Sequence, residues 1–173
     1  MSDALQTTVL LALPGLAIAA ALSDATSMTI PNWISGLLVA AFAPAAILVH
    51  APLQTIGMSC GLGAAALVAG AGMFALRWIG GGDAKLLAAS TLWMGAAGAP
   101  AFLLWTAIAG GIFGLGLLSA RRMVAIAGLP VRQPAWVGRL LEPAGDIPYG
   151  VAIAAGALIA FPHSALMTVA HAA

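Results

Sequence analysis

The longest apolar stretch of the chain, residues 84–120, reads AKLLAASTLWMGAAGAPAFLLWTAIAGGIFGLGLLSA. As a single α-helix this stretch would be roughly 55 Å long at 1.5 Å per residue, nearly twice the thickness of the hydrocarbon core of a bilayer. We therefore predict a break between Gly95 and Pro100. The break divides the stretch into two membrane spans, residues 84–98 and 101–120.

The composition of the whole chain places it among integral membrane proteins. The 173 residues are 62% hydrophobic and 6% charged, with a mean hydropathy of +1.08, and a soluble domain needs a more polar surface. The abundance of Ala, Leu and Gly favours helices over the alternating strands of a barrel. Apolar runs recur at residues 7–22, 33–49, 53–76, 84–98, 101–120 and 149–170. We predict an all-α membrane protein, a polytopic bundle of about six transmembrane helices forming one domain, residues 1–173.

The basic side chains predict the orientation of this bundle. With six crossings, both termini fall on one side of the membrane, and every lysine and arginine falls on the other: Arg77, Lys85, Arg121, Arg122, Arg132 and Arg139. By the positive-inside rule the basic side is cytoplasmic, and both termini face outward. A cytoplasmic loop is expected at about residues 121–147. It is either a plain solvated loop or one in which residues 131–141 lie on the lipid surface.

Two of the five acidic residues, Asp24 and Asp83, lie at span boundaries. Asp24 ends the first span and Asp83 opens the fourth, so two crossings lie between them and both reach the cytoplasmic end. Two carboxylates in a poorly solvated site tend to share one proton. One can then act as a base on water while the other donates a proton to a peptide carbonyl. Such a pair needs neither metal nor cofactor, and it predicts an aspartic protease site.

Other interpretations of these residues remain open. Gly80, Gly81 and Gly82 leave room for a substrate backbone ahead of Asp83 and permit dihedral angles closed to other residues. The same turn also suits a helix N-cap, in which the aspartate only accepts backbone N–H bonds, as in a non-catalytic assembly subunit. Asp24 could reach lipid headgroups as an interfacial residue. A small proton-coupled transporter or channel, with both aspartates as a proton relay, is the alternative function.

Three sequence elements together resemble a known family. They are an aspartate at the end of the first span followed by Ile30-Pro31-Asn32, then Gly80-Gly81-Gly82-Asp83-Ala84-Lys85 opening a later span, and Ile147-Pro148-Tyr149-Gly150 before the last span. In this order they resemble the type IV prepilin peptidases, intramembrane aspartic proteases of the GxGD class. The resemblance is closest to the small CpaA/TadV-type enzymes of Flp pilus systems.

This resemblance implies that the basic leader peptide of a pilin precursor is cleaved at the cytoplasmic face of a bacterial inner membrane. Asp24 and Asp83 would be the catalytic dyad, and the pilus assembly machinery a further partner. The resemblance gives supporting roles to Gly80, Gly81, Gly82 and Lys85. It gives substrate positioning to Pro31, Asn32, Pro148 and Tyr149. Tyr149 could equally be an interfacial anchor, and Asn32 could equally be a helix cap.

One departure from the larger members of that family limits the expected chemistry. Those enzymes carry a cytoplasmic insertion with two Cys-x-x-Cys pairs, associated with N-methylation of the new pilin terminus. This chain has a single cysteine, Cys60, so neither a methyltransferase activity nor its zinc is expected. With a net charge of only +1, the chain does not have the excess of basic residues that indicates a nucleic-acid partner. Membrane lipid is the other expected partner.

Overall fold

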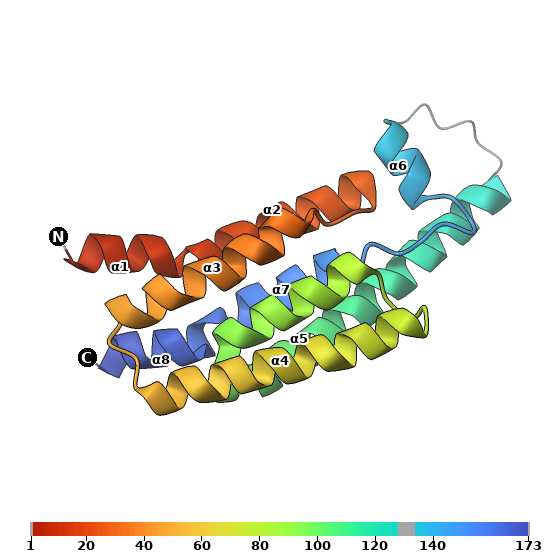
Figure 1. Cartoon of the computed structure of the whole chain (residues 1–173). Helices are drawn as coiled ribbons and strands as arrows, with labels where there is room; N and C mark the ends of the chain where they lie inside the picture. Colours follow the sequence, from red (N-terminus) through yellow and green to blue (C-terminus); the bar gives the residue numbers. More distant parts are fainter. Residues whose placement is uncertain (1, 128–133, 173) are drawn as a thin grey trace.

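The computed structural model describes residues 2–127 and 134–172, and their regular structure is helical throughout (Figure 1). The helices are α1 (Ser2–Leu10), α2 (Ala12–Ser27), α3 (Asn32–Leu48), α4 (Leu53–Ala75), α5 (Gly81–Ala127), α6 (Ala135–Leu140), α7 (Gly150–Ala160), a 3₁₀ turn (Phe161–His163) and α8 (Ala165–Ala172). The predicted all-α membrane bundle is confirmed.

The predicted spans all correspond to helical segments. Within the described residues, four stretches are long and apolar enough to cross a bilayer: Thr8–Ser27, Leu53–Ala75, Gly81–Ile126 and Gly150–Ala172. Helix α3 is a further apolar helix of 17 residues. The stretch Gly81–Ile126, with 46 residues, is too long for one crossing and holds two of the predicted spans.

Helix α5 breaks at Gly95, inside the interval where the sequence predicts a break. The φ and ψ angles of Gly95 are 56° and −163°, outside the helical region and unfavourable for a residue with a side chain. A Cβ atom there would also lie 2.6 Å from both Ala165 Cβ and Ser59 Oγ. Figure 1 shows the chain turning back at this point, so that the two parts of α5 run in opposite directions. Pro100 lies in the second part, which continues through it.

The first part of α5 forms the centre of the core. The Trp93 side chain is fully buried, its Nε1 donates a hydrogen bond to the Leu38 carbonyl of α3 at 2.8 Å, and its ring meets Phe42 edge-on with centroids 6.0 Å apart. Glycines of α4 let that helix approach closely, because a Cβ at Gly70 would lie 3.1 Å from Ala84 Cβ. These contacts fix the direction in which α5 leaves the Asp83 turn.

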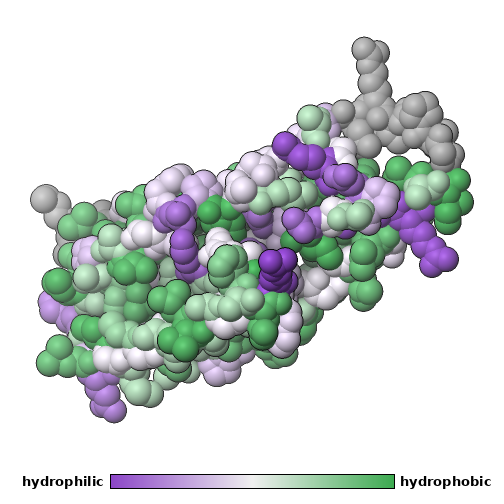
Figure 2. Space-filling model, turned by 45° about the vertical axis from the view of Figure 1, so that its right-hand side comes forward, coloured by the Kyte–Doolittle hydropathy of each residue, from purple (hydrophilic) through white to green (hydrophobic). Residues whose placement is uncertain are grey.

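The outside of the bundle is apolar. Large side chains such as those of Leu53, Val68 and Ile126 are 86%, 74% and 78% exposed, which is favourable only where lipid covers them. Figure 2 shows hydrophobic residues over most of one face, with the deepest hydrophilic colour on the right-hand half, toward α6. The chain is therefore a multi-pass membrane protein.

The predicted loop at residues 121–147 is only partly correct. Residues 121–127 are helical, since the second part of α5 continues to Ala127. Helix α6 lies within the rest of the predicted loop. Residues 128–133, which include Arg132 and the first three residues of the segment expected at the lipid surface, lie outside the described residues. Both termini lie at one end of the bundle, while the end of α2 and the start of α5 lie at the other (Figure 1).

Candidate active site

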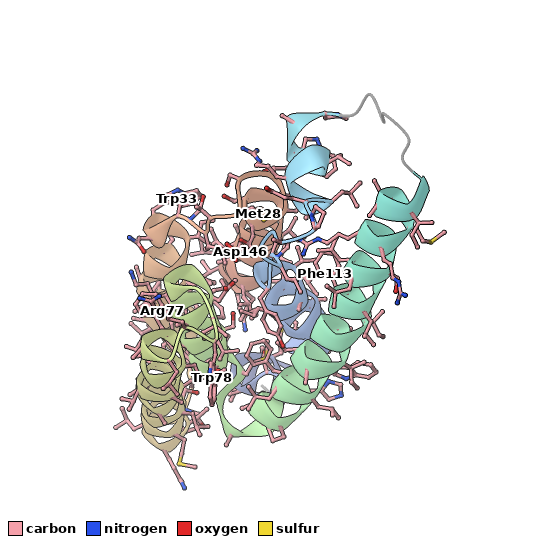
Figure 3. All side chains as sticks on the ribbon, turned by 90° about the vertical axis from the view of Figure 1, so that its right-hand side faces the viewer. Met28, Trp33, Arg77, Trp78, Phe113 and Asp146 are labelled. Atoms are coloured by element: carbon pink, nitrogen blue, oxygen red, sulfur yellow. The ribbon has the colours of Figure 1, made fainter. Side chains whose placement is uncertain are left out.

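A cavity of about 820 Å³ opens at the end of the bundle opposite the termini. It is formed by the end of α2, the α4–α5 turn and the segment before α7, and its lining includes Asp24, Met28, Met73, Phe74, Arg77, Trp78, Gly80, Asp83, Asp146, Pro148 and Tyr149. Figure 3 looks onto this end, with the labelled Met28, Arg77, Trp78 and Asp146 around the opening. Segments far apart in the sequence therefore share one cavity.

Asp24 lies in the last turn of α2 and is held by the first residue of α7. Its side chain is only 5% exposed, and its Oδ2 accepts a hydrogen bond of 2.7 Å from the backbone N–H of Gly150. The first N–H groups of a helix have no partner within the helix, and the positive end of the helix dipole favours a carboxylate there. A Cβ at Gly150 would lie 2.8 Å from Asp24 Oδ2 and 2.7 Å from Ile30 Cδ1. Only glycine lets α7 come this close.

Replacing Gly150 by alanine is expected to displace the Asp24 carboxylate or to push α7 away from it. Overpacking of a tight contact costs about 1–3 kcal/mol, so we expect a peptide-cleavage rate lower by about tenfold or more, together with lower stability in detergent. Gly116→Ala is the matched control, because no atom lies within 4 Å of a Cβ added at that position of α5. Equal cleavage rates for the two variants would contradict the role given to Gly150.

Asp83 lies in the first turn of α5, and its two oxygens have different surroundings. Oδ2 accepts the backbone N–H of Gly80 at 3.1 Å, while the Gly80 carbonyl accepts the N–H of Ala84 at 3.1 Å. The bond to Oδ2 is the one that the third helical residue makes to the N-cap residue in a capping box, so Gly80 is the N-cap and Asp83 supports the helix start from inside the first turn. Oδ1 is buried and has no hydrogen-bond partner among the described residues. Capping therefore does not explain the second oxygen of Asp83, a residue that lines the cavity.

The two carboxylates belong to one site. Asp24 and Asp83 line the same cavity, so both side chains lie at the same end of the bundle. This agrees with the expectation that two crossings between them bring both to one end of the bundle. Each Oδ2 is held by a backbone N–H, so both side chains have fixed orientations.

The glycines before Asp83 serve close packing, and none of the three has the positive φ that glycine permits. Among the described glycines only Gly95 has a positive φ. A Cβ at Gly80 would lie 2.8 Å from Asp83 Oδ2, and one at Gly82 would lie 3.0 Å from Ile30 Cβ. The left-handed residue of the turn is instead Arg77, with φ of 60°.

Comparison with known proteins now bears on this site. The sequence model of the type IV leader peptidase family matches residues 11–115, more than half of the chain, including both aspartates. The chain belongs to the type IV leader peptidase family. Comparisons with curated proteins and with solved structures gave no match. Family membership makes this a peptidase with a prepilin substrate, and it does not favour the alternative of a transporter or channel.

The residues expected to support the site or position the substrate of this leader peptidase lie in different places. Pro148 and Tyr149 line the cavity. A Cβ at Gly110 would lie 2.6 Å from the Tyr149 hydroxyl, so this side chain packs against the second part of α5. Lys85 and Asn32 instead bond to each other, from Nζ to Oδ1 at 2.8 Å, and line a different groove. Pro31 precedes the first residue of α3 and lines neither.

Sequence reasoning missed the structural role of Arg121 in this leader peptidase. It is only 4% exposed, and its guanidinium donates three hydrogen bonds to backbone carbonyls, those of Leu140 (2.8 Å), Gly145 (2.7 Å) and Asp146 (2.8 Å). These bonds fix the segment that leads into the cavity wall and α7. The sequence signal was an arginine at the end of an apolar run, which indicated only membrane orientation.

Proposed function

We propose that this leader peptidase is an aspartic endopeptidase in which Asp24 and Asp83 form the catalytic dyad. The observation that supports it is the shared cavity, which is lined by the buried Asp24 of α2 and the half-buried Asp83 of α5. Hydrogen bonds from Gly150 and Gly80 orient one oxygen of each. The unpartnered Oδ1 of Asp83 is suited to a water molecule or a peptide group.

The chemistry follows from two carboxyl groups that share one proton. The ionised member takes a proton from water as that water attacks the scissile carbonyl carbon, while the protonated member donates to the carbonyl oxygen. The tetrahedral intermediate then collapses as the newly protonated group donates its proton to the leaving amine, while the other group takes back a proton from a hydroxyl of the intermediate. These steps leave both groups as they began, ready for another cycle.

The charges at the cavity support a basic leader as the substrate segment. Three carboxylates, those of Asp24, Asp83 and Asp146, line the cavity beside one cation, Arg77. A basic leader would be attracted to this excess of acid, while the apolar pilin helix that follows it stays in lipid. By the positive-inside rule the cavity faces the cytoplasm of the bacterial inner membrane and both termini face the periplasm. We further propose pilins of the Flp type as substrates and no methyltransferase activity, since the chain has one cysteine.

The test is cleavage of a pilin precursor by the purified protein in liposomes, with a methyl donor present. Mass spectrometry should show the leader removed and the new N-terminus unmethylated. The comparison is the same preparation of the double variant Asp24→Asn/Asp83→Asn, which should leave the precursor intact. Cleavage at the same rate by that variant, or none by the folded parent protein, would refute the proposal.

A further inference from the structure

A second groove, separate from the cavity, lies between α3, α4 and α5 and has a volume of about 570 Å³. Each helix contributes one face with side chains at the i, i+3, i+4 and i+7 spacing, and small residues keep the groove open. A Cβ at Gly36 would have no atom within 4 Å, which shows that the space beside α3 is unfilled. The proposed peptidase chemistry uses none of this groove.

One end of the groove carries polar groups with unused hydrogen-bonding capacity. Lys85 Nζ donates to Asn32 Oδ1 at 2.8 Å, which leaves two ammonium N–H groups and the Asn32 amide N–H₂ without a partner among the described residues. Ser35 lies one helical turn beyond Asn32 and is only 7% exposed. Its hydroxyl also has no partner within the described part of the chain, and Ser35 lines the groove. These donors, with a positive charge, suit an oxygen-rich anion.

The remainder of the groove is apolar and runs into the bilayer. Val39, Leu67 and Leu92 line it, and the distance along α5 from Lys85 to Leu92 is about 10 Å at 1.5 Å per residue. Because Lys85 lies one turn into α5 at the end of the bundle, this length extends from headgroup level into the hydrocarbon core, which is about 30 Å thick. The groove is thus polar where headgroups lie and apolar where acyl chains lie.

We propose that this groove binds one anionic phospholipid. Its phosphate and ester oxygens accept hydrogen bonds from Lys85, Asn32 and Ser35, and one acyl chain lies along Val39, Leu67 and Leu92. The charge favours this occupant over the substrate, because a basic leader would be repelled by the Lys85 ammonium. The site is distinct from the aspartate cavity, and its occupation by lipid does not depend on how the peptide is cleaved.

The first test measures which lipid the protein retains. The full chain, extracted from nanodiscs of equal parts phosphatidylglycerol and phosphatidylcholine, is examined by native mass spectrometry. We expect one phosphatidylglycerol to be retained in preference, and Lys85→Gln to lower its retention by about tenfold or more through loss of charge-assisted hydrogen bonds. Arg122→Gln is the matched control, since Arg122 is an exposed cation of α5 that does not line the groove. It should retain the lipid as the parent does.

The second test fills the groove and leaves its charge in place. Gly36→Phe should expel the acyl chain and lower lipid retention, whereas Gly15→Phe, also on an unobstructed helix face but in α2, should not. Thermal unfolding of each variant establishes that it is folded. The proposal would be overturned if Lys85→Gln retained the lipid as the parent does, or if the parent retained both lipids equally. It would also be overturned if a photoreactive residue at position 36 captured a pilin precursor and not lipid.

Discussion

Asp83→Asn is expected to lower the rate of prepilin cleavage by about 10²–10⁴-fold, the usual contribution of a positioned acid or base. The amide oxygen of asparagine can still accept the Gly80 N–H that Asp83 Oδ2 accepts, so the first turn of α5 keeps its cap. Asp24→Asn should behave in the same way, because its amide oxygen can still accept the N–H of Gly150. Cleavage is measured on membrane-inserted protein, whose unfolding temperature should stay close to that of the parent.

The matched control for these substitutions is Glu142→Gln. Glu142 is an exposed acid in the segment between α6 and α7 and does not line the cavity, so its neutralisation should leave the rate unchanged. Asp83→Asn separates the two roles of Asp83, since the asparagine amide can accept the Gly80 N–H but has no acidic proton. Normal cleavage by either asparagine variant would show that the aspartate supports the helix start or lies at the interface and is not part of a dyad.

Arg121→Lys is expected to have the largest effect of any substitution outside the dyad. The guanidinium reaches three carbonyls from three different nitrogen atoms, and a single ammonium group cannot match that geometry. With two of the three bonds lost, and each hydrogen bond to a charged group worth about 1.5–3 kcal/mol, the folded state should lose about 3 kcal/mol or more. Cleavage should slow as well, because the segment released leads into the cavity wall and to Gly150.

Arg122→Lys is the control, since Arg122 is the exposed neighbour of Arg121 on α5 and keeps its charge in the variant. Its unfolding temperature and cleavage rate should match those of the parent protein. If Arg121→Lys also unfolded and cleaved as the parent does, the three hydrogen bonds would have no part in holding the segment before α7.

The arrangement of the spans could be predicted because the bilayer constrains it strongly. A fixed hydrocarbon thickness divides residues 84–120 into two, and counting crossings brings Asp24 and Asp83 to one end. The turn point at Gly95 depends on a further fact: Ser59 and Ala165 occupy the space that a Cβ at this position would need. That approach is a tertiary contact with no pattern in the sequence, so only an interval could be given.

The details of the site depended on contacts between distant residues, which one sequence does not reveal. The bond from Gly150 to Asp24 and the three bonds of Arg121 join segments that have no local signal for each other. Lys85 is two residues after Asp83, and on a helix this spacing sends the two side chains in different directions. The motif therefore suggested a shared role, whereas the structure places Lys85 at the groove between α3, α4 and α5.

The Asp24–Gly150 hydrogen bond also determines when, during synthesis of the chain, the cavity around Asp24 can form. It joins residues 126 positions apart, and its donor opens the final membrane-crossing segment. A nascent chain that still ends before residue 150 contains both acidic side chains but lacks the group that orients the first. Ribosome-bound intermediates of that length therefore hold both acidic side chains of the cavity without their final geometry, which forms only as the segment Gly150–Ala172 inserts.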